Sequence, residues 1–275
     1  MNNSSSQTEL RIRTATVLIL VLSGVLLAGP DWLWTVLVLA LAGVAAAEWA
    51  GLCTWPPRMR NAFVALILLL ALAMAQSAGH AAWLDAGVLL ASLLFWLLVA
   101  PLSLRSGWSG RGARGVSGAL VIVPLVWAVL WLQQQAHGKL LLFAGMAVVW
   151  VSDSAAYFAG RRWGRRKLAP AVSPGKTWEG VAGGIAAVAL YTVLLWLLAA
   201  ERLPAGLPEL LALTLLMSLL GVVGDLYESW MKRVAGVKDS GRCLPGHGGL
   251  LDRIDALAAA LPAWAGGLWL AGFGA

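Results

Sequence analysis

Long apolar runs separated by short polar segments dominate the pattern of this sequence. About nine such runs are present, each near the roughly 20 residues that a helix needs to cross about 30 Å of hydrocarbon. They lie at residues 14–28, 32–52, 62–77, 81–102, 116–133, 140–160, 179–200, 208–231 and 256–273. The pattern therefore predicts an all-α, polytopic membrane helical bundle of about nine transmembrane helices.

The composition supports a membrane protein. Of the 275 residues, 60% are hydrophobic and only 12% are charged, which is too apolar for a soluble domain of this size. The first ten residues are polar and lack the basic start of a signal peptide, so we expect the first run to be retained as a span. Cys53 and Cys243 fall in different predicted loops, and we expect both to be free thiols.

The positions of the basic residues predict the orientation of the spans. If the N-terminus is cytoplasmic, the 20 Lys and Arg residues all fall in cytoplasmic segments except Lys139 and Arg202. The positive-inside rule then puts the C-terminus on the opposite side of a cytoplasmic (inner) membrane. The net charge of +7 is thus explained by topology and by anionic ligands, and we expect no nucleic-acid partner.

The polar residues are distributed unevenly, which divides the chain into two predicted regions. Residues 1–135 hold about five spans and few ionisable groups, chiefly Glu48 and Asp85, which we interpret as residues at the membrane interface. Residues 136–275 hold about four spans and the polar segments "WVSDSAAYFAGRRWGRRK", "VSPGKTWEG" and "GVVGDLYESWMKR". All three reach the predicted cytoplasmic side, so the second region is expected to carry the active site.

Acidic residues near the C-terminus indicate a divalent cation. Asp225, Glu228, Ser229 and Lys232 follow helical spacing and share one helix face, and Asp252 and Asp255 share a face of the next helix. Carboxylates on two facing helices, Asp225 on one and Asp252 or Asp255 on the other, can hold Mg²⁺. The alternative for the first helix is an interfacial end whose basic residues reach the head groups and pair with its acids. No cluster of His and Cys residues suggests zinc.

Two other segments have the residue types of a phosphate site. In "VSPGKTWEG" a Ser-Pro-Gly turn places Lys176 and Thr177 at a helix start with Glu179 in its first turn. The alternative is a simple capped helix start after a proline turn. In the other segment Asp153 and Tyr157 share a helix face ahead of the basic cluster "RRWGRRK", which can anchor at anionic lipid or hold a phosphorylated substrate.

The stretch "SWMKRVAGVKDSGRCLPGHGGLLDRID", residues 229–255, closely resembles the signature of the phosphatidate cytidylyltransferase (CDP-diacylglycerol synthase) family. The resemblance extends over roughly residues 140–275. It implies the reaction of CTP with phosphatidic acid to give CDP-diacylglycerol and pyrophosphate, with Mg²⁺ as cofactor and room for a second ion. The positions that match are Ser229, Lys232, Arg233, Lys238, Asp239, Gly241, His247, Gly248, Gly249, Asp252, Arg253 and Asp255.

For this reaction we assign roles to the residues as a hypothesis. Asp225 and Asp252 are the expected metal carboxylates, with Asp255 or Asp239 assisting, and the remaining catalytic residues are Lys232, Lys238, His247 and Arg253. The expected substrate-binding residues are Asp153, Tyr157, Ser173, Lys176, Thr177, Glu179, Glu228, Ser229 and Arg233. The expected partners are CTP, phosphatidic acid and membrane lipids.

Two other functions are kept as alternatives. A CTP-dependent lipid kinase of the polyprenol or phytol type would use similar groups and transfer the terminal phosphoryl group. A secondary transporter would place charged residues in a central cavity, but here they gather at one membrane face. The sequence leaves open the acyl-chain preference and whether the protein forms a homo-oligomer.

Overall fold

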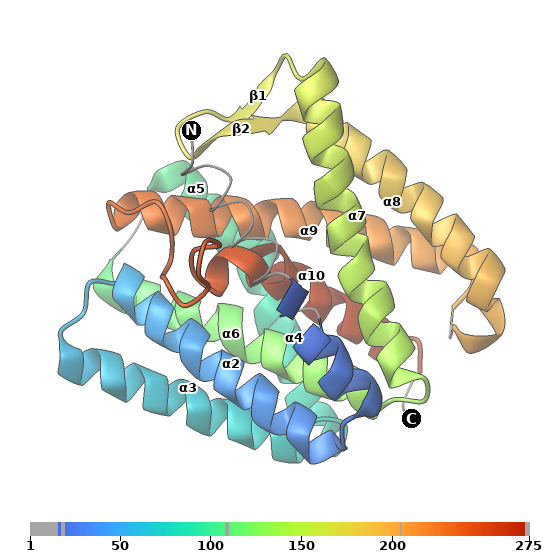
Figure 1. The fold of residues 1–275 in the computed structure, drawn as a ribbon, viewed down its shortest axis with the longest axis horizontal. Helices are drawn as coiled ribbons and strands as arrows, with labels where there is room; N and C mark the ends of the chain where they lie inside the picture. The colour runs from blue at the N-terminus through green and yellow to red at the C-terminus, as the bar shows by residue number, and fades with distance from the viewer. Residues whose placement is uncertain (1–15, 18–19, 108–109, 204, 273–275) are drawn as a thin grey trace.

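Helices make up almost all of the protein in a computed structural model that describes residues 16–17, 20–107, 110–203 and 205–272 (Figure 1). A helical stretch at residues 20–28 precedes the first labelled element. The elements that follow are α2 (Asp31–Leu52), α3 (Pro57–Ser77), α4 (Ala82–Leu94), the π-helix η1 (Phe95–Val99), α5 (Ala100–Ser106), α6 (Arg111–Gln134), α7 (Gly138–Trp163), β1 (Lys167–Ala169), β2 (Ser173–Thr177), α8 (Trp178–Ala199), the 3₁₀ helix η2 (Ala200–Arg202), α9 (Leu207–Val234) and α10 (Leu251–Leu270).

The predicted all-α, multi-pass membrane bundle is confirmed. Within the described residues, seven helical segments are long and apolar enough to cross a membrane, and α4, η1 and α5 together form one of them, Ala82–Ser106. Part of the first predicted run, 14–28, lies outside the described residues. The ninth run forms α10, most of whose residues are buried inside the bundle. The number of nine spans and the direction of the termini stay predictions.

Small residues let the helices of the C-terminal half approach closely. A Cβ atom at Gly184 on α8 would lie 3.0 Å from the Ser152 carbonyl oxygen on α7, and one at Gly145 would lie 2.6 Å from the Trp264 ring on α10. Such close contacts supply the van der Waals packing that holds helices together in lipid, where apolar burial between helices contributes little.

Buried hydroxyl groups add hydrogen bonds between the same helices. The Ser152 and Ser218 hydroxyl oxygens on α7 and α9 are 2.7 Å apart. The Thr192 and Thr214 hydroxyl oxygens on α8 and α9 are also 2.7 Å apart. Each of these four hydroxyls therefore has a partner away from lipid, where an unpaired polar group is costly.

A short antiparallel hairpin, which the sequence pattern did not predict, connects α7 to α8. Strands β1 and β2 pair with Lys167 opposite Thr177 and Ala169 opposite Ser173. At its base the Glu179 carboxylate accepts hydrogen bonds from the backbone nitrogens of Arg165 and Arg166, at 3.0 and 3.2 Å. These bonds tie the start of α8 to the chain that leaves α7. Residues 173–177 pair with β1 as a strand, where we expected a Ser-Pro-Gly turn.

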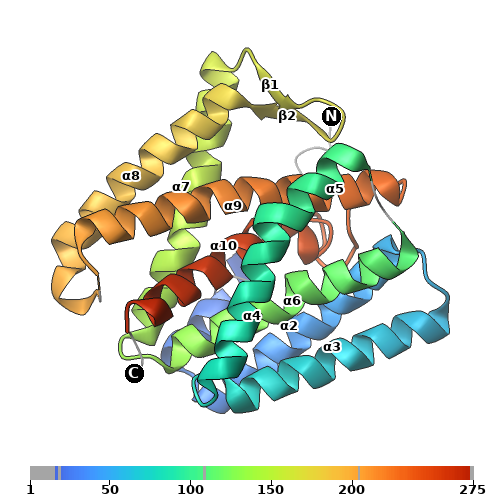
Figure 2. The ribbon, with the colours of Figure 1, turned by 180° about the vertical axis from the view of Figure 1, so that it is seen from behind.

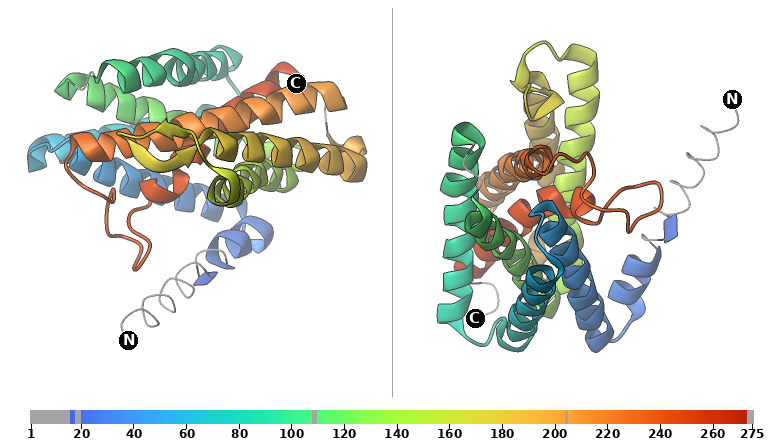
Figure 3. Two further views of the ribbon diagram at one scale, coloured as in Figure 1. Left: turned by 90° about the horizontal axis from the view of Figure 1, so that it is seen from above. Right: turned by 90° about the vertical axis from the view of Figure 1, so that its left-hand side faces the viewer.

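The connections that carry polar residues lie toward one end of the bundle. Figure 1 shows the β1–β2 hairpin, the loop between α9 and α10 and the connection from α2 to α3 at its upper and left sides. Lys139 and Arg202, the two basic residues predicted on the non-cytoplasmic side, line one cavity at the other end. Seen from behind, α4 and α5 cross the back of α6, α9 and α10 (Figure 2), and two further views show the loop between α9 and α10 projecting from the bundle (Figure 3).

Asp85, which we interpreted as a residue at the membrane interface, is buried between helices. Its side chain is only 1% exposed and accepts hydrogen bonds from Trp127 Nε1 at 2.6 Å and from the Gly79 backbone nitrogen at 3.1 Å. A carboxylate with two donors can stay buried, so Asp85 joins the start of α4 to α6.

Candidate active site

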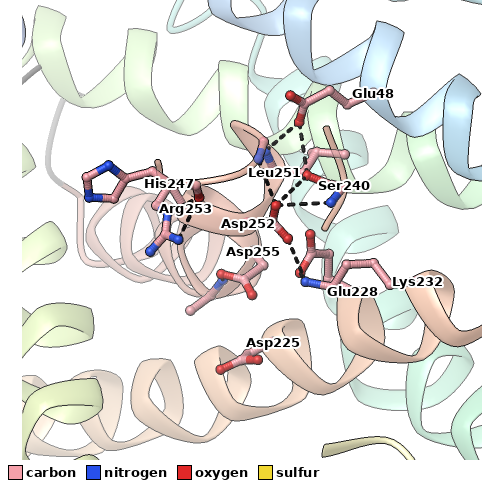
Figure 4. Close-up of polar contacts among 12 residues, drawn as sticks. Glu48, Asp225, Glu228, Lys232, Ser240, His247, Leu251, Asp252, Arg253 and Asp255 are labelled. Carbon is pink, nitrogen blue, oxygen red and sulfur yellow. Dashed lines mark hydrogen bonds and ion pairs between the residues drawn. The ribbon is translucent and has the colours of Figure 1, made fainter. Parts of the chain in front are cut away.

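The crossing of α9 and α10 brings the predicted metal carboxylates together. Gly224 makes the crossing close, because a Cβ atom there would lie 2.5 Å from the Asp255 carbonyl oxygen. Asp225 follows Gly224 on α9, and the side chains of Asp225 and Asp255 extend into the same region between the two helices (Figure 4). The predicted pairing of acids from two helices is therefore present for Asp225 and Asp255.

A single lysine lies among several of these acids. Lys176 Nζ on β2 is 2.5 Å from Asp225 Oδ2. Asp153 on α7 and Asp255 on α10 each interact electrostatically with both Asp225 and Lys176. Three carboxylates thus share one ammonium group, which leaves an excess of negative charge that a bound cation would neutralise.

Lys232 joins α9 to α10 through two carboxylates. Its Nζ atom is 2.7 Å from Glu228 Oε2, one turn earlier on α9, and 2.6 Å from Asp252 Oδ1 on α10. The other Glu228 oxygen, Oε1, is buried and has no hydrogen-bond partner in the part of the chain that the structure describes. The pair with Glu228 is the contact that the interfacial alternative includes, whereas the pair with Asp252 on α10 is a contact that this alternative did not include.

Asp252 is held by protein donors on both oxygens. Oδ1 pairs with Lys232, and Oδ2 accepts from the Ser240 backbone nitrogen at 3.0 Å, the Ser240 hydroxyl at 3.1 Å and the Gly249 backbone nitrogen at 2.8 Å. Burial alone would raise the pKa of Asp252, but these hydrogen bonds hold it below its usual value. Asp252 in this arrangement fixes the α9–α10 loop, whereas Asp225, Asp255 and Asp153 form an acidic cluster around Lys176.

Glu48, which we interpreted as a residue at the membrane interface, contacts the loop that carries the candidate site. Its carboxylate accepts hydrogen bonds from the backbone nitrogens of Leu250 at 3.0 Å and Leu251 at 2.9 Å, and from the Ser240 hydroxyl at 3.1 Å. It satisfies the free N–H groups at the start of α10 and lies at the positive end of the helix dipole. A carboxylate close to the end of an apolar run was the only signal for it in the sequence.

The thiol of Cys243 also contacts Glu48. Cys243 is exposed overall, but partial desolvation of its thiol, with a hydrogen bond to Glu48 and the charge of that carboxylate, raises the pKa of Cys243 to about 11. The thiol is therefore a proton donor at neutral pH. Cys53 and Cys243 are both free, as predicted.

The loop between α9 and α10 forms a small polar cleft. Gly246 and Gly248 have φ values of +77° and +84°, which side chains with a Cβ atom rarely adopt, and Leu244 pairs with Gly248 across the resulting turn. The cleft is lined by the signature residues Lys238, Asp239, Gly246, His247, Gly248 and Arg253. Its two cationic side chains and the backbone N–H groups of its glycine turn suit an anionic, phosphorylated ligand.

Two residues of this cleft contact each other. The Arg253 guanidinium donates hydrogen bonds to the His247 carbonyl oxygen, at 2.7 Å from Nη2 and 3.2 Å from Nε. His247 Nδ1 is buried without a hydrogen-bond partner in the described residues, and the ring points away from Asp252 (Figure 4). The described residues therefore leave one buried polar atom of His247 unpaired.

The predicted phosphate segment on the hairpin contributes Lys176 to the cluster. Ser173, half-buried, starts the same strand, β2. Thr177 is buried and caps α8, because its hydroxyl accepts a hydrogen bond from the Gly180 backbone nitrogen at 3.1 Å. Glu179 accepts from the hairpin backbone, as described above. Thr177 and Glu179 thus have the structural roles of a capped helix start, the alternative to a phosphate site, while Lys176 pairs with Asp225.

Three other predicted residues lie at the edge of this arrangement. Tyr157 is exposed on α7, and its hydroxyl accepts a hydrogen bond from Arg161 at 3.1 Å. Ser229 is half-buried on α9, and Arg233 is exposed in the last turn of that helix. Their proposed contacts with substrate stay predictions.

The acidic cluster suits a metal that takes part of its coordination from a substrate. Among the described residues, no group of three or more His, Cys, Asp or Glu side chains is arranged as a ready metal site. Mg²⁺ commonly uses one or two carboxylates together with water and substrate phosphates. Asp225 and Asp255, with the unpartnered Glu228 Oε1 nearby on α9, fit that donor set.

Comparisons with known proteins agree on one family. The model of the "Cytidylyltransferase family" matches residues 9–269. A phosphatidate cytidylyltransferase of Pseudomonas aeruginosa is 40% identical over 271 residues, which cover 96% of this chain and 98% of the relative. Proteins of the same name from Haemophilus influenzae and Bacillus subtilis are 47% and 48% identical over 152 and 126 residues, which cover 51% and 46% of this chain and 52% and 46% of the relatives.

Proposed function

Since the chain belongs to the cytidylyltransferase family, we propose that it transfers CMP from CTP to phosphatidic acid, giving CDP-diacylglycerol and pyrophosphate. The observation that carries the proposal is the position of two kinds of group around the first turn of α10. The acidic cluster of Asp225 and Asp255 lies at this turn, and so does the cationic cleft of Lys238, His247 and Arg253. Enzymes that transfer nucleotidyl groups use carboxylates that bind a metal ion together with cationic side chains that bind phosphate.

We propose Mg²⁺ as the cofactor of this reaction. Asp225 and Asp255 would hold it, because their mutual repulsion is only partly offset by Lys176. When bound, the ion neutralises charge on the nucleotide phosphates. Asp252 supports this site from its own position, by keeping Lys232 and the loop in place.

The protein's own residues would supply alignment and charge. A phosphate oxygen of phosphatidic acid attacks the α-phosphorus of CTP, a bond forms between them, and the bond to pyrophosphate breaks. The nucleophile is already an anion, so no side chain has to remove a proton from it. Lys238 and Arg253 would neutralise the phosphates in the cleft, and Lys176 would be released from Asp225 to neutralise the second phosphorylated substrate.

Two features of the chain support a lipid substrate and a cytoplasmic active site. The chain is a multi-pass membrane protein with the site at the end of the bundle that carries most of the basic residues. We place it in the cytoplasmic (inner) membrane with the active site facing the cytoplasm, where CTP is found.

Product identification tests the proposal. Purified full-length protein is incubated with CTP labelled in the cytidine ring, phosphatidic acid and Mg²⁺, and the lipid and nucleotide products are separated. Labelled CDP-diacylglycerol with equimolar pyrophosphate is the expected result. Formation of CDP together with a newly phosphorylated lipid would instead identify a CTP-dependent lipid kinase.

A further inference from the structure

An apolar cavity lies beside the candidate active site, between residues 20–28, α2, α6, α7 and α10. The α2 wall includes Val38, Ala42 and Ala45, and the α10 wall includes Leu250, Ile254 and Leu257. Apart from Ser23, every side chain that lines it is aliphatic, aromatic or, at Met146, a thioether. Such a lining selects an aliphatic ligand and offers little to a polar one.

The cavity ends next to the polar cleft. On α10 the lining residue Leu250 lies two positions after Gly248, and the lining residue Ile254 directly follows Arg253, and both of these neighbours line the cleft. On α2 the lining residue Ala45 lies one turn before Glu48, whose carboxylate binds the start of α10. The polar and apolar spaces therefore adjoin at the first turn of α10.

We propose that this cavity holds one acyl chain of the phosphatidic acid whose phosphate reacts at the adjoining site. The inference rests on the proposed function, because it takes the lipid to be the substrate. From Leu250 to Leu261, the α10 residues that line the cavity extend over about 16 Å of helix. On α2 the lining extends from Ala45 back to Trp34, about three turns away from the Glu48 end of the helix.

Ala42 offers the test position. It is 4% exposed and lines the cavity, so Ala42→Phe directs a ring into the space for the chain. Ala40→Phe is the matched control, because Ala40 is exposed on α2 and does not line the cavity. Initial rates of CDP-diacylglycerol formation are measured in mixed micelles with dihexadecanoyl and dioctanoyl phosphatidic acid.

We expect Ala42→Phe to lower kcat/KM at least tenfold for the long-chain lipid and less than twofold for the short-chain lipid, and Ala40→Phe to change neither. An unchanged ratio of the kcat/KM values for the two lipids in folded Ala42→Phe protein overturns the proposal.

A phosphatidic acid with a diazirine in one acyl chain gives a second measurement that needs no turnover. Crosslinks in the α2 and α10 peptides of the cavity support the site, and crosslinks found only elsewhere overturn it. Wild-type protein that makes no CDP-diacylglycerol from either lipid contradicts the proposed function, and the crosslinks then decide the acyl site by themselves.

A separate observation assigns a role to Glu48. It lies on α2, outside the predicted catalytic region, yet it bonds the first turn of α10 and the Ser240 hydroxyl. The Ser240 hydroxyl also bonds Asp252, so a single side chain links Glu48 to Asp252. The structure assigns Glu48 as a positioning residue, which holds the α9–α10 loop against α10 in the geometry needed for transfer.

Asp85 is the matched control for Glu48, since it is also a buried carboxylate with backbone and side-chain donors but bonds far from the site. We expect Glu48→Gln and Asp85→Asn to lower the melting temperature by similar amounts. Only Glu48→Gln should lower kcat, at least tenfold, with KM for CTP changed less than threefold. Equal loss of kcat in both variants overturns the assignment. If Glu48→Gln does not fold, Ser240→Ala removes the hydroxyl that links Glu48 to Asp252. Wild-type kcat in that variant overturns the assignment.

Discussion

Lys232 on α9 and Asp252 on α10 form a partly buried ion pair with an Nζ to Oδ1 distance of 2.6 Å. The same ammonium group binds Glu228 at 2.7 Å, so one cation balances two carboxylates from two helices. The pair joins the end of α9 to the first turn of α10 and thereby sets the position of the loop between them.

Removal of Lys232 should be strongly destabilising. Lys232→Met leaves Glu228 and Asp252 without their shared cation, and removing one partner of a buried pair costs about 3–5 kcal/mol. Chemical unfolding in detergent measures the change. Arg233→Met, an exposed neighbour on the same helix, should change the free energy of unfolding by less than about 1 kcal/mol. Equal destabilisation by the two substitutions would contradict the buried bridge.

Asp225 should be required for metal-dependent turnover. Asp225→Asn removes a charge from the acidic cluster, and we expect kcat to fall by about 100-fold or more, because charge stabilisation at the reacting phosphates is lost. Removing divalent cations from the wild-type protein with a chelator should abolish turnover, and excess Mg²⁺ should restore it.

The control for Asp225 is Asp31→Asn, at the start of α2 and at the opposite end of the bundle. It should retain wild-type turnover and the wild-type dependence on Mg²⁺. Asp225→Asn protein that turns over normally with Mg²⁺ would rule out the central part of the metal proposal.

The close crossing at Gly224 should tolerate no side chain. Gly224→Ala places a methyl group against the Asp255 carbonyl oxygen, so α9 and α10 must separate, at a cost of about 1–3 kcal/mol. Separation also moves Asp225 from Asp255, and a misplacement of about 1 Å can cost on the order of 100-fold in rate. Thermal unfolding and turnover measure the two effects.

Gly87→Ala on α4 provides the comparison, since a Cβ atom at Gly87 meets no atom within 4 Å. It should be neutral or stabilising by up to about 1 kcal/mol, as expected for Gly to Ala within a helix. If Gly224→Ala were equally neutral, the two helices would not be in the contact described.

The thiol of Cys243 should react slowly at neutral pH. With the pKa raised to about 11, little thiolate is present at pH 8, and alkylation should be on the order of 100-fold slower than for an ordinary thiol of pKa about 8.5. The rate should rise about tenfold per pH unit toward pH 11. Mass spectrometry of iodoacetamide-treated Cys53→Ser protein measures it. Glu48→Gln should accelerate the reaction, whereas alkylation at pH 8 as fast as that of glutathione would exclude the contact with Glu48.

The sequence by itself determined the class of fold and the family, and it predicted which segments carry the site and which of their residues act there. These inferences depend on local properties: the length of apolar runs, the placement of Lys and Arg residues, and helical spacing that puts Asp225 and Lys232 on one face. They also depend on a dense signature in residues 229–255. Patterns of this kind can be recognised in the sequence without knowledge of how the helices pack against one another.

Only the tertiary structure decided which acids meet and what holds them. Glu48 bonds Leu251 across 203 positions of the chain, and Lys176 pairs with Asp225 from a hairpin that the pattern of apolar residues does not reveal. Asp252 and Asp255 look equivalent in sequence, but one is held by protein donors and the other faces the acidic cluster. The physical reason is that the partner of a buried charge is set by how helices cross, and a crossing depends on long-range contacts such as that at Gly224.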